Sequence, residues 1–242
     1  MTALRFSIEA QPFVGCTGRG IRVAVVDSGV AVGHSHVGSV LAGVSLVAGV
    51  DDTLDRIGHG TAVAAAIREK APDVELVPVK IFDRVLRTDA RTLADAIRWA
   101  ADHDCRVANL SLGTANTEHS APLEEAVRYA GERGTLVVAV LESDGTHWLP
   151  GGVSGVVPVL GDADLDRDAL TLDAAGAGAA RRDRFSASVY PRPIPGVPRE
   201  RNLHGASFAV ANATGFLARL MEREPQIRTP HDLSALLQAT LR

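Results

Sequence analysis

Short, mostly apolar runs alternate along this chain with longer stretches in which apolar residues recur every three or four positions. The runs lie at residues 23–26, 74–79, 107–112 and 136–141; the second contains Glu75, and the third contains Asn109 and Ser111. Runs of this length with few polar residues are typical of strands that are buried on both faces. Between them, the helical spacing predicts helices over residues 61–70, 91–103 and 121–133, and Pro122 suits the first turn of the last one.

This alternation of strands and helices predicts the fold class. Consecutive strands joined by helices form a parallel sheet, and right-handed crossovers place the helices on its faces. We therefore predict an α/β protein in which a mostly parallel central sheet lies between helices on both faces. Two further helices are expected near residues 206–222 and 230–241.

The stretch from residue 161 to residue 184 breaks this pattern. It is rich in Asp, Ala, Gly and Arg, and a proline-rich loop follows at 191–198. We interpret residues 161–200 as an irregular surface segment. The chain contains no internal repeat and no interdomain linker, so we predict one domain over residues 1–242, with residues 1–20 as an N-terminal extension.

Composition narrows the class of protein. The 242 residues are 46% hydrophobic and 22% charged, which is typical of a folded globular chain. The net charge of −4 argues against a nucleic-acid partner. No apolar run approaches the roughly 20 residues that span a membrane, and the first residues do not form a secretory signal. We therefore expect a cytoplasmic protein, whose oligomeric state the sequence leaves open.

The cysteines and the acidic residues predict no metal site and no cofactor. Cys16 and Cys105 lack metal-ligand spacing, and we expect two reduced, buried thiols; a disulfide between them is the unsupported alternative. The acidic cluster formed by Asp51, Asp52 and Asp55 has the oxygen ligands that a cation needs. We interpret this cluster as a solvated acidic loop.

Three separate segments carry the candidate chemistry. Asp27 ends the first apolar run, His59 opens a predicted helix within Gly-His-Gly-Thr, and Ser207 opens another within Gly-Ala-Ser-Phe-Ala. A serine hydroxyl needs a base to accept its proton, and an imidazole base needs a carboxylate that fixes its tautomer. Each segment alone is an ordinary turn or helix cap. Together, in this order, they predict a catalytic triad, with the backbone amide of Ser207 as one oxyanion donor.

At these segments the chain resembles the subtilisin-like serine proteases, the subtilase family. The matching residues are Asp-Ser-Gly at 27–29, His-Gly-Thr-Ala-Val-Ala at 59–64, Asn-Leu-Ser-Leu-Gly at 109–113 and Gly-Ala-Ser-Phe-Ala at 205–209. The resemblance implies a subtilisin-like three-layer fold and endopeptidase activity on a peptide or protein substrate. It also implies that Ser111, Leu112 and Gly113 bind the peptide as an added strand.

One departure from the family pattern affects the oxyanion site. The family supplies its second oxyanion donor from an asparagine, and this chain has Val-Leu-Glu-Ser at the matching residues 140–143. Ser143 is the candidate replacement and His147 the alternative. Glu142 replaces a family glycine in the wall of the substrate pocket. It either points to solvent or narrows the pocket and favours a basic substrate side chain.

Two larger features of secreted relatives are also missing. The calcium-binding loop has no counterpart, because residues 67–73 lead directly into the next predicted strand. The 20 residues before the first core strand are too few for a folded pro-segment. We therefore expect a specialised intracellular processing protease that acts on a precursor peptide. The alternatives are a catalytically impaired peptide-binding module and an acyl-transfer ligase or cyclase on the same fold.

Overall fold

The computed structural model describes residues 3–175 and 182–240, and a single sheet runs through them. Its strands are β1 (Leu4–Ser7), β2 (Arg22–Asp27), β3 (Val44–Ser45), β4 (Glu75–Lys80), β5 (Val107–Leu110), β6 (Leu136–Ser143), β7 (Thr146–His147), β8 (Val156–Asp162), β9 (Ala169–Asp173) and β10 (Arg184–Ser188). The strand order is β1-β9-β10-β8-β6-β5-β2-β4-β3, with β7 paired to the end of β6.

The central strands are parallel, as predicted. Strands β3, β4, β2, β5, β6, β8 and β10 pair in parallel from neighbour to neighbour. Antiparallel pairs occur where β9 meets β10 and β1, and where β7 folds back on β6. The sheet therefore has the mostly parallel α/β architecture that the alternating pattern predicts.

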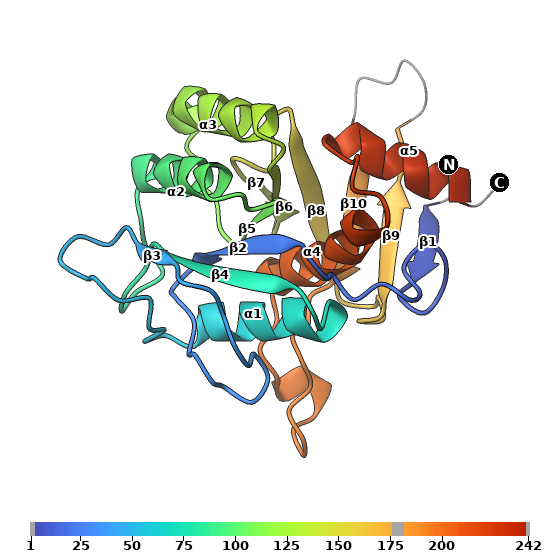
Figure 1. Cartoon of the computed structure of the whole chain (residues 1–242), viewed down its shortest axis with the longest axis horizontal. Helices are drawn as coiled ribbons and strands as arrows, with labels where there is room; N and C mark the ends of the chain where they lie inside the picture. Colours follow the sequence, from blue (N-terminus) through green and yellow to red (C-terminus); the bar gives the residue numbers. More distant parts are fainter. Residues whose placement is uncertain (1–2, 176–181, 241–242) are drawn as a thin grey trace.

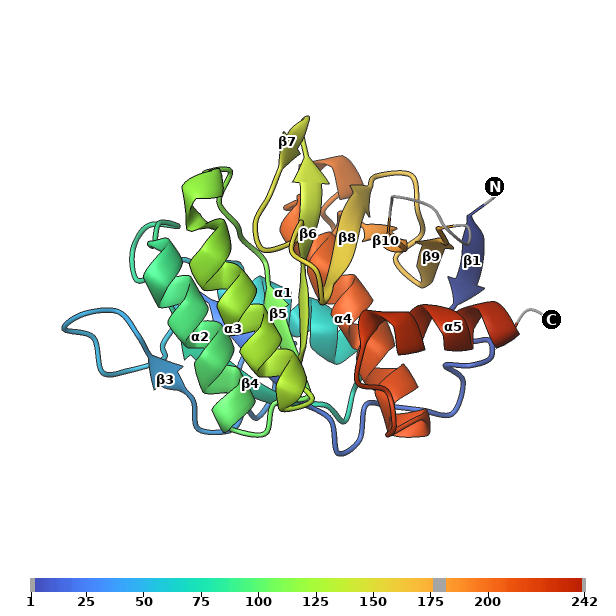
Figure 2. The ribbon, with the colours of Figure 1, turned by 90° about the horizontal axis from the view of Figure 1, so that it is seen from above.

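Helices cover both faces of the sheet (Figures 1 and 2). On one face lie α1 (His59–Lys70), α4 (Ala206–Arg223) and α5 (Pro230–Thr240), and on the other lie α2 (Ala90–Asp102) and α3 (Ser120–Glu132). Two short 3-10 helices, η1 (Thr117–His119) and η2 (Arg199–Arg201), lie in connecting segments. Each predicted helix is confirmed to within two residues, except that residue 241 lies outside the described residues.

Strand β2 shows why these runs are mostly apolar. Val23 and Val25 face the core beneath α1 and α4, whereas Ala24 and Val26 face the core beneath α2 and α3. Side chains alternate between the faces of a strand, so both sets must be apolar when helices cover both faces. The same alternation directs the next side chain, that of Asp27, toward the α1 layer.

The prediction for residues 161–200 is wrong in part. Strands β9 and β10 lie within this segment, and Leu170, Leu172, Phe185 and Ala187 are buried. Most of their neighbours in the two strands are half-buried, and Ala169 and Ser188 are buried as well. Residues 176–181, which the same prediction included, lie outside the described residues.

The N-terminal extension also joins the sheet. Residues 4–7 form β1 at the edge of the sheet, where it pairs with β9. This strand was not predicted. Within the described residues, no helix combines the length and the apolar character that a membrane span requires.

Candidate active site

Asp27 lies at the carboxyl end of β2, near the middle of the sheet. Its side chain is fully buried, and its Oδ1 accepts a hydrogen bond of 2.7 Å from the backbone amide of Ser28. The carboxyl ends of parallel strands form the edge at which open α/β sheets place their functional sites. The alternation along β2 turns the carboxylate toward the start of α1.

His59 is the first residue of α1 and meets this carboxylate. Its Nδ1 lies 2.8 Å from Asp27 Oδ1 and 3.0 Å from Oδ2. Because an ionised carboxylate only accepts hydrogen bonds, the pair requires the proton on Nδ1 and leaves Nε2 as an acceptor. The His59 side chain is 19% exposed, so the ring remains accessible from the edge of the sheet.

Burial alone would lower the pKa of His59, but the charge and hydrogen bond of Asp27 outweigh it. Together with the more distant charge of Asp55, they raise the pKa of His59 above its ordinary value of 6.5. The imidazole is thereby made a stronger base.

The turn before His59 is held by Asp55. This carboxylate accepts hydrogen bonds from the amides of Ile57, Gly58 and Thr61, and also from the Ser28 hydroxyl. Asp55 therefore caps α1 and ties it to the turn that follows Asp27. Burial opposes ionisation, but hydrogen bonds from the Thr61 hydroxyl and from the three amides keep the pKa of Asp55 below its ordinary value.

Gly60 allows α1 to approach the β2 turn. A Cβ at position 60 would overlap the carbonyl oxygen of Gly29 and lie 3.1 Å from the Cβ of Asp27. Only a residue without a side chain brings the two segments close enough for His59 to reach Asp27.

Ser207 lies in the first turn of α4 at the same edge of the sheet. Its hydroxyl donates a 2.9 Å hydrogen bond to the carbonyl oxygen of Ser111, just beyond β5. The ring of His59 lies 5.7 Å from that of Phe208, measured between centroids. Within the described residues, Ser207 makes no hydrogen bond to His59. The structure thus joins Asp27 to His59 directly and brings the ring of Phe208, the residue after Ser207, near the ring of His59.

A buried polar network connects the end of β5 to α4, the helix that carries Ser207. Thr214 donates to Asn109 Oδ1 at 2.9 Å, and Asn109 Nδ2 donates to the hydroxyl of Ser111 at 3.0 Å. Asn109 and Thr214 are fully buried, so each depends on these partners. The network fixes the end of β5 against α4.

A cavity of about 270 Å³ opens beside Ser207. None of the residues that line it carries a charge: Ser111, Leu112, Gly113, Val140, Ser143, Trp148, Ala206 and Ser207. The segment Ser111–Gly113 therefore lies on this cavity, as does Ser143, and both were selected from the sequence.

The segment that lacks the family asparagine folds into a hairpin. Strand β6 runs to Ser143, and Asp144 and Gly145 turn the chain with φ values of 51° and 73°. Two consecutive residues with positive φ form the tight turn that suits the twist of a hairpin. Strand β7 returns along β6, and Ser143 pairs with Thr146.

Glu142 and His147 lie outside the cavity. They face each other across the hairpin, with 3.5 Å between His147 Nδ1 and Glu142 Oε2. The His147 side chain is 77% exposed. The Glu142 side chain is 41% exposed, which favours the alternative in which it points to solvent; its role in the pocket wall stays a prediction.

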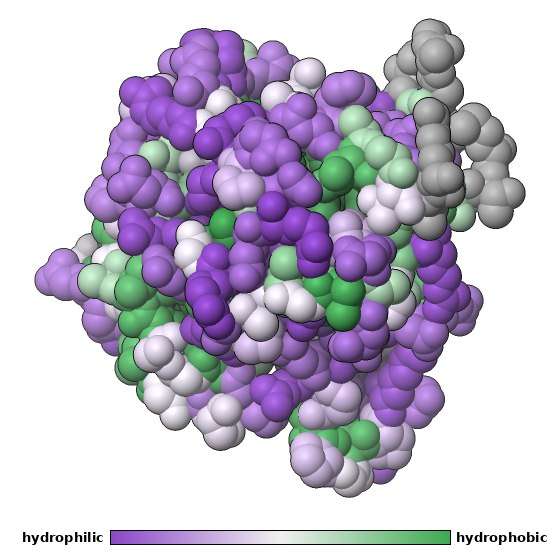
Figure 3. All heavy atoms as spheres, turned by 45° about the vertical axis from the view of Figure 1, so that its right-hand side comes forward, coloured by the Kyte–Doolittle hydropathy of each residue, from purple (hydrophilic) through white to green (hydrophobic). Residues whose placement is uncertain are grey.

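A second cavity, of about 470 Å³, borders His59 from the side of α1. Its walls include Gly58 and Thr61, which flank His59 in the sequence, and parts of segment 191–203. That segment forms the lobe at the bottom of Figure 3, where it exposes Ile194, Val197 and Leu203.

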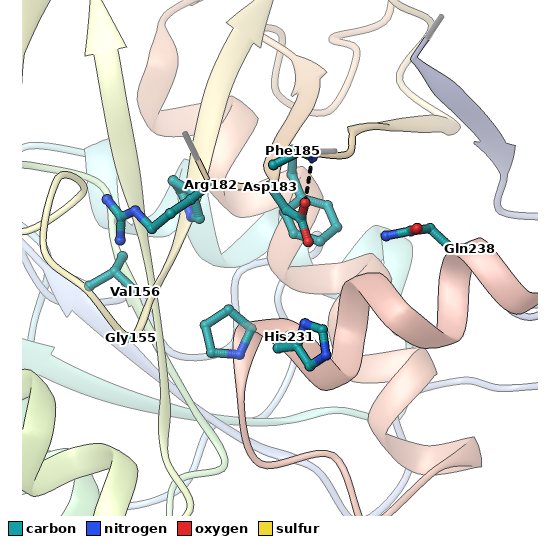
Figure 4. A pocket seen from close by; sticks show the side chains of 10 residues that line it. Gly155, Val156, Arg182, Asp183, Phe185, His231 and Gln238 are labelled. Carbon is teal, nitrogen blue, oxygen red and sulfur yellow. Dashed lines mark hydrogen bonds between the residues drawn. The ribbon is translucent and has the colours of Figure 1, made fainter. Parts of the chain in front are cut away.

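A third cavity lies far from these residues. Its volume is about 520 Å³, and it is lined by the start of β8, the segment before β10 and the start of α5 (Figure 4). The carboxyl end of β8, in contrast, approaches Ala206 through Gly161. The third cavity therefore lies at the opposite end of β8 from Ser207.

The acidic cluster forms an ion pair with a neighbouring arginine, and the two cysteines are buried. Asp52 pairs with Arg56 at 2.7 Å, and Arg56 lowers the pKa of Asp52. Among residues 3–175 and 182–240, no group of three or more His, Cys, Asp or Glu side chains could hold a metal ion. Cys16 and Cys105 are buried free thiols, and burial raises the pKa of Cys105 to about 12.

The fold and these side chains define an α/β protein of the serine peptidase class. The Subtilase family matches residues 18–141, and the chain belongs to that family. It is 32% identical to Subtilisin BL of Lederbergia lenta over 222 residues, which cover 87% of this chain and 80% of that protein. It is 31% identical to an alkaline protease of Alkalihalobacillus alcalophilus, of whose length the match spans 56%.

Solved structures share the fold at lower sequence identity. A cold-adapted subtilisin-like serine proteinase matches with a TM-score of 0.71 and 21% identity, over 91% of this chain and 82% of that one. The nisin leader peptidase NisP of Lactococcus lactis matches with a TM-score of 0.67 and 19% identity, over 90% and 81%. A lanthipeptide protease matches with a TM-score of 0.60 and 18% identity, over 90% and 78%.

Proposed function

We propose that the protein is a serine endopeptidase in which Ser207 is the nucleophile, His59 the general base and Asp27 the residue that orients His59. The observation that carries this proposal is the 2.8 Å contact between the buried Asp27 carboxylate and His59, whose ring lies 5.7 Å from that of Phe208, the residue after Ser207. A buried carboxylate that fixes one imidazole tautomer is the arrangement that makes histidine a base toward serine.

The reaction begins when the Ser207 hydroxyl leaves the Ser111 carbonyl and turns toward His59 Nε2. As Ser207 Oγ attacks the peptide carbonyl carbon, its proton passes to Nε2, and Asp27 stabilises the imidazolium. His59 then protonates the leaving amine, and the carbon–nitrogen bond breaks. Water deprotonated by His59 next hydrolyses the acyl-enzyme and restores Ser207.

Two donors hold the oxyanion in this proposal. The amide of Ser207 lies in the first turn of α4, where amides have no partner within the helix and the helix dipole favours negative charge. The second donor is the hydroxyl of Ser143, which lines the same cavity. Its proximity to Ser207 supports this role.

The substrate in this proposal is an extended peptide. Its residue before the scissile bond enters the uncharged cavity beside Ser207, and its main chain pairs with Ser111–Gly113. The part after the scissile bond occupies the cavity bordered by segment 191–203. We further propose a precursor peptide as the physiological substrate, processed inside the cell. Two structural neighbours, the lanthipeptide protease and the nisin leader peptidase, motivate this choice.

Labelling by a fluorophosphonate tests the nucleophile, because this reagent traps an activated serine. We expect the wild type to be labelled and Ser207→Ala to remain unlabelled while keeping the same circular dichroism spectrum. A peptide library analysed by mass spectrometry then identifies the cleaved bonds. Folded wild type that binds peptides but neither reacts nor cleaves would instead be a peptide-binding module. Added amines that are joined to the acyl fragment would identify a ligase.

A further inference from the structure

Trp148 connects two parts of the site that the mechanism above treats separately. It directly follows β7, and its backbone amide donates to the carbonyl oxygen of Leu141 at 2.9 Å. Its side chain lines the cavity beside Ser207 and is partly buried against the core. Trp148 thus lies in the cavity and, at the same time, belongs to the hairpin that carries Ser143.

The indole of Trp148 donates a hydrogen bond to the hydroxyl oxygen of Ser143. The distance from Nε1 to Oγ is 2.9 Å, and an indole N–H can only donate. Ser143 Oγ therefore acts as an acceptor in this contact and keeps its own proton. Within residues 3–175 and 182–240, that hydroxyl donates to no protein acceptor, so its proton is available to a ligand in the cavity.

The chain at Trp148 and Leu149 also packs closely against the cavity wall formed by Ser111–Gly113. A Cβ at position 113 would lie 3.1 Å from the Cβ of Trp148 and 2.6 Å from the carbonyl oxygen of Leu149. Thr114 and Leu149 exchange two backbone hydrogen bonds of 2.9 Å just beyond this contact. The wall formed by Ser111–Gly113 therefore cannot move away from Trp148 without breaking that pairing.

We propose that Trp148 is a positioning residue for the second oxyanion donor and, through its ring, a specificity residue. Its N–H orients the Ser143 hydroxyl so that the hydroxyl proton points toward the oxyanion. Its ring limits the depth of the cavity that receives the side chain before the scissile bond. This inference rests on the proposed endopeptidase function and names its substrate class: peptides with a small or medium uncharged side chain at that position.

The two roles are separated by two variants. Trp148→Phe keeps an aromatic ring but has no N–H, so we expect kcat to fall about 2- to 10-fold, the net effect of losing one hydrogen bond. KM and the order of preferred side chains should stay as in the wild type. Trp148→Ala removes the ring, so the rate ratio of phenylalanine to alanine substrates should rise at least tenfold.

The assay uses one peptide series that differs only in the residue before the cleaved bond: Ala, Val, Leu, Phe, Lys or Asp. The Ser143→Ala background provides the matched control, because Trp148→Phe should change kcat less than 1.5-fold there. Such non-additivity measures coupling between the two side chains and would not arise from a purely structural loss. If Trp148→Phe does not fold, benzothienylalanine at position 148 removes the N–H while keeping the bicyclic shape.

Two results would overturn the inference. One is an unchanged kcat without the indole N–H, or the same loss with and without the Ser143 hydroxyl. The other is an unchanged rate ratio of phenylalanine to alanine substrates in Trp148→Ala. The endopeptidase proposal fails in a different way, because the wild type itself would then cleave no member of the series and would not react with fluorophosphonate.

Discussion

Lys80 offers a quantitative test of what holds the Asp27 turn in place. Its side chain is fully buried, and Nζ donates 2.8 Å hydrogen bonds to the carbonyl oxygens of Ser28 and Leu54. The same ammonium lies 3.2 Å from Asp83 Oδ1. Lys80 therefore ties the turn after Asp27 to the acidic loop before His59. Lys80→Met keeps the apolar length of the side chain and removes all three interactions.

The expected loss in the free energy of unfolding of Lys80→Met follows from these contacts. Removing one partner from a buried charged pair costs about 3–5 kcal/mol. In Lys80→Met, Asp83 keeps its ion pair with Arg56 at 2.8 Å, and its side chain is 21% exposed. Its charge is therefore neither unpaired nor fully buried. We therefore expect the lower end, a loss of about 3 kcal/mol in the free energy of unfolding. For a chain of this size, that loss lowers Tm by about 6–12 °C.

The assay is guanidinium chloride unfolding followed by circular dichroism, in a Ser207→Ala background that prevents self-cleavage. Arg84→Met is the matched control, because Arg84 also pairs with Asp83, at 3.5 Å, but its side chain is 79% exposed. We expect that variant to lose less than about 0.5 kcal/mol. Equal losses in the two variants would refute the reasoning, since burial would then add nothing to the role of Lys80.

Three further predictions concern activity. Asp27→Asn should lower kcat about 10⁴-fold. Because catalysis needs neutral His59 and Asp27 raises the pKa of His59, the acidic limb of kcat/KM should also move to lower pH; a limb that stays in place contradicts this. Gly60→Ala should reduce both Tm and kcat, because its Cβ overlaps the Gly29 carbonyl; wild-type values would exclude close packing there. Ser143→Asn should raise kcat on a fixed peptide, and an unchanged or lower rate would remove Ser143 from the oxyanion site.

The central fold could be predicted because its physical cause is local. Strands covered on both faces are mostly apolar, so the buried parts of β2, β4, β5 and β6 are visible as runs with few polar residues. Strands β9 and β10 are short, and half-buried polar residues interrupt their buried positions: Thr171 and Asp173 in β9, Arg184 and Ser186 in β10. Charged and small residues around these strands obscure their alternation of buried and half-buried positions. The sequence pattern therefore does not predict strands within residues 161–200.

The residues of the candidate site also differ in whether the local sequence pattern reveals them. Asp27, His59 and Ser207 are found from sequence because each sits at the end of a strand or the start of a helix. The sequence analysis does not identify Trp148, because its contact with Ser143 depends on a reversal of the chain between the two residues. Asp144 and Gly145 do form the Asp-Gly pair that is typical of a hairpin turn, so this reversal was the one signal available in the sequence.

The hairpin at residues 140–149 has a consequence for how such a peptidase can diversify. Asp27, His59 and Ser207 come from three distant places and cannot be altered as a unit. The hairpin, in contrast, is one uninterrupted stretch that carries Ser143 and Trp148 together. Transplanting this stretch between relatives would therefore change the second proposed oxyanion donor and the adjoining cavity wall together, while Asp27, His59 and Ser207 keep their places.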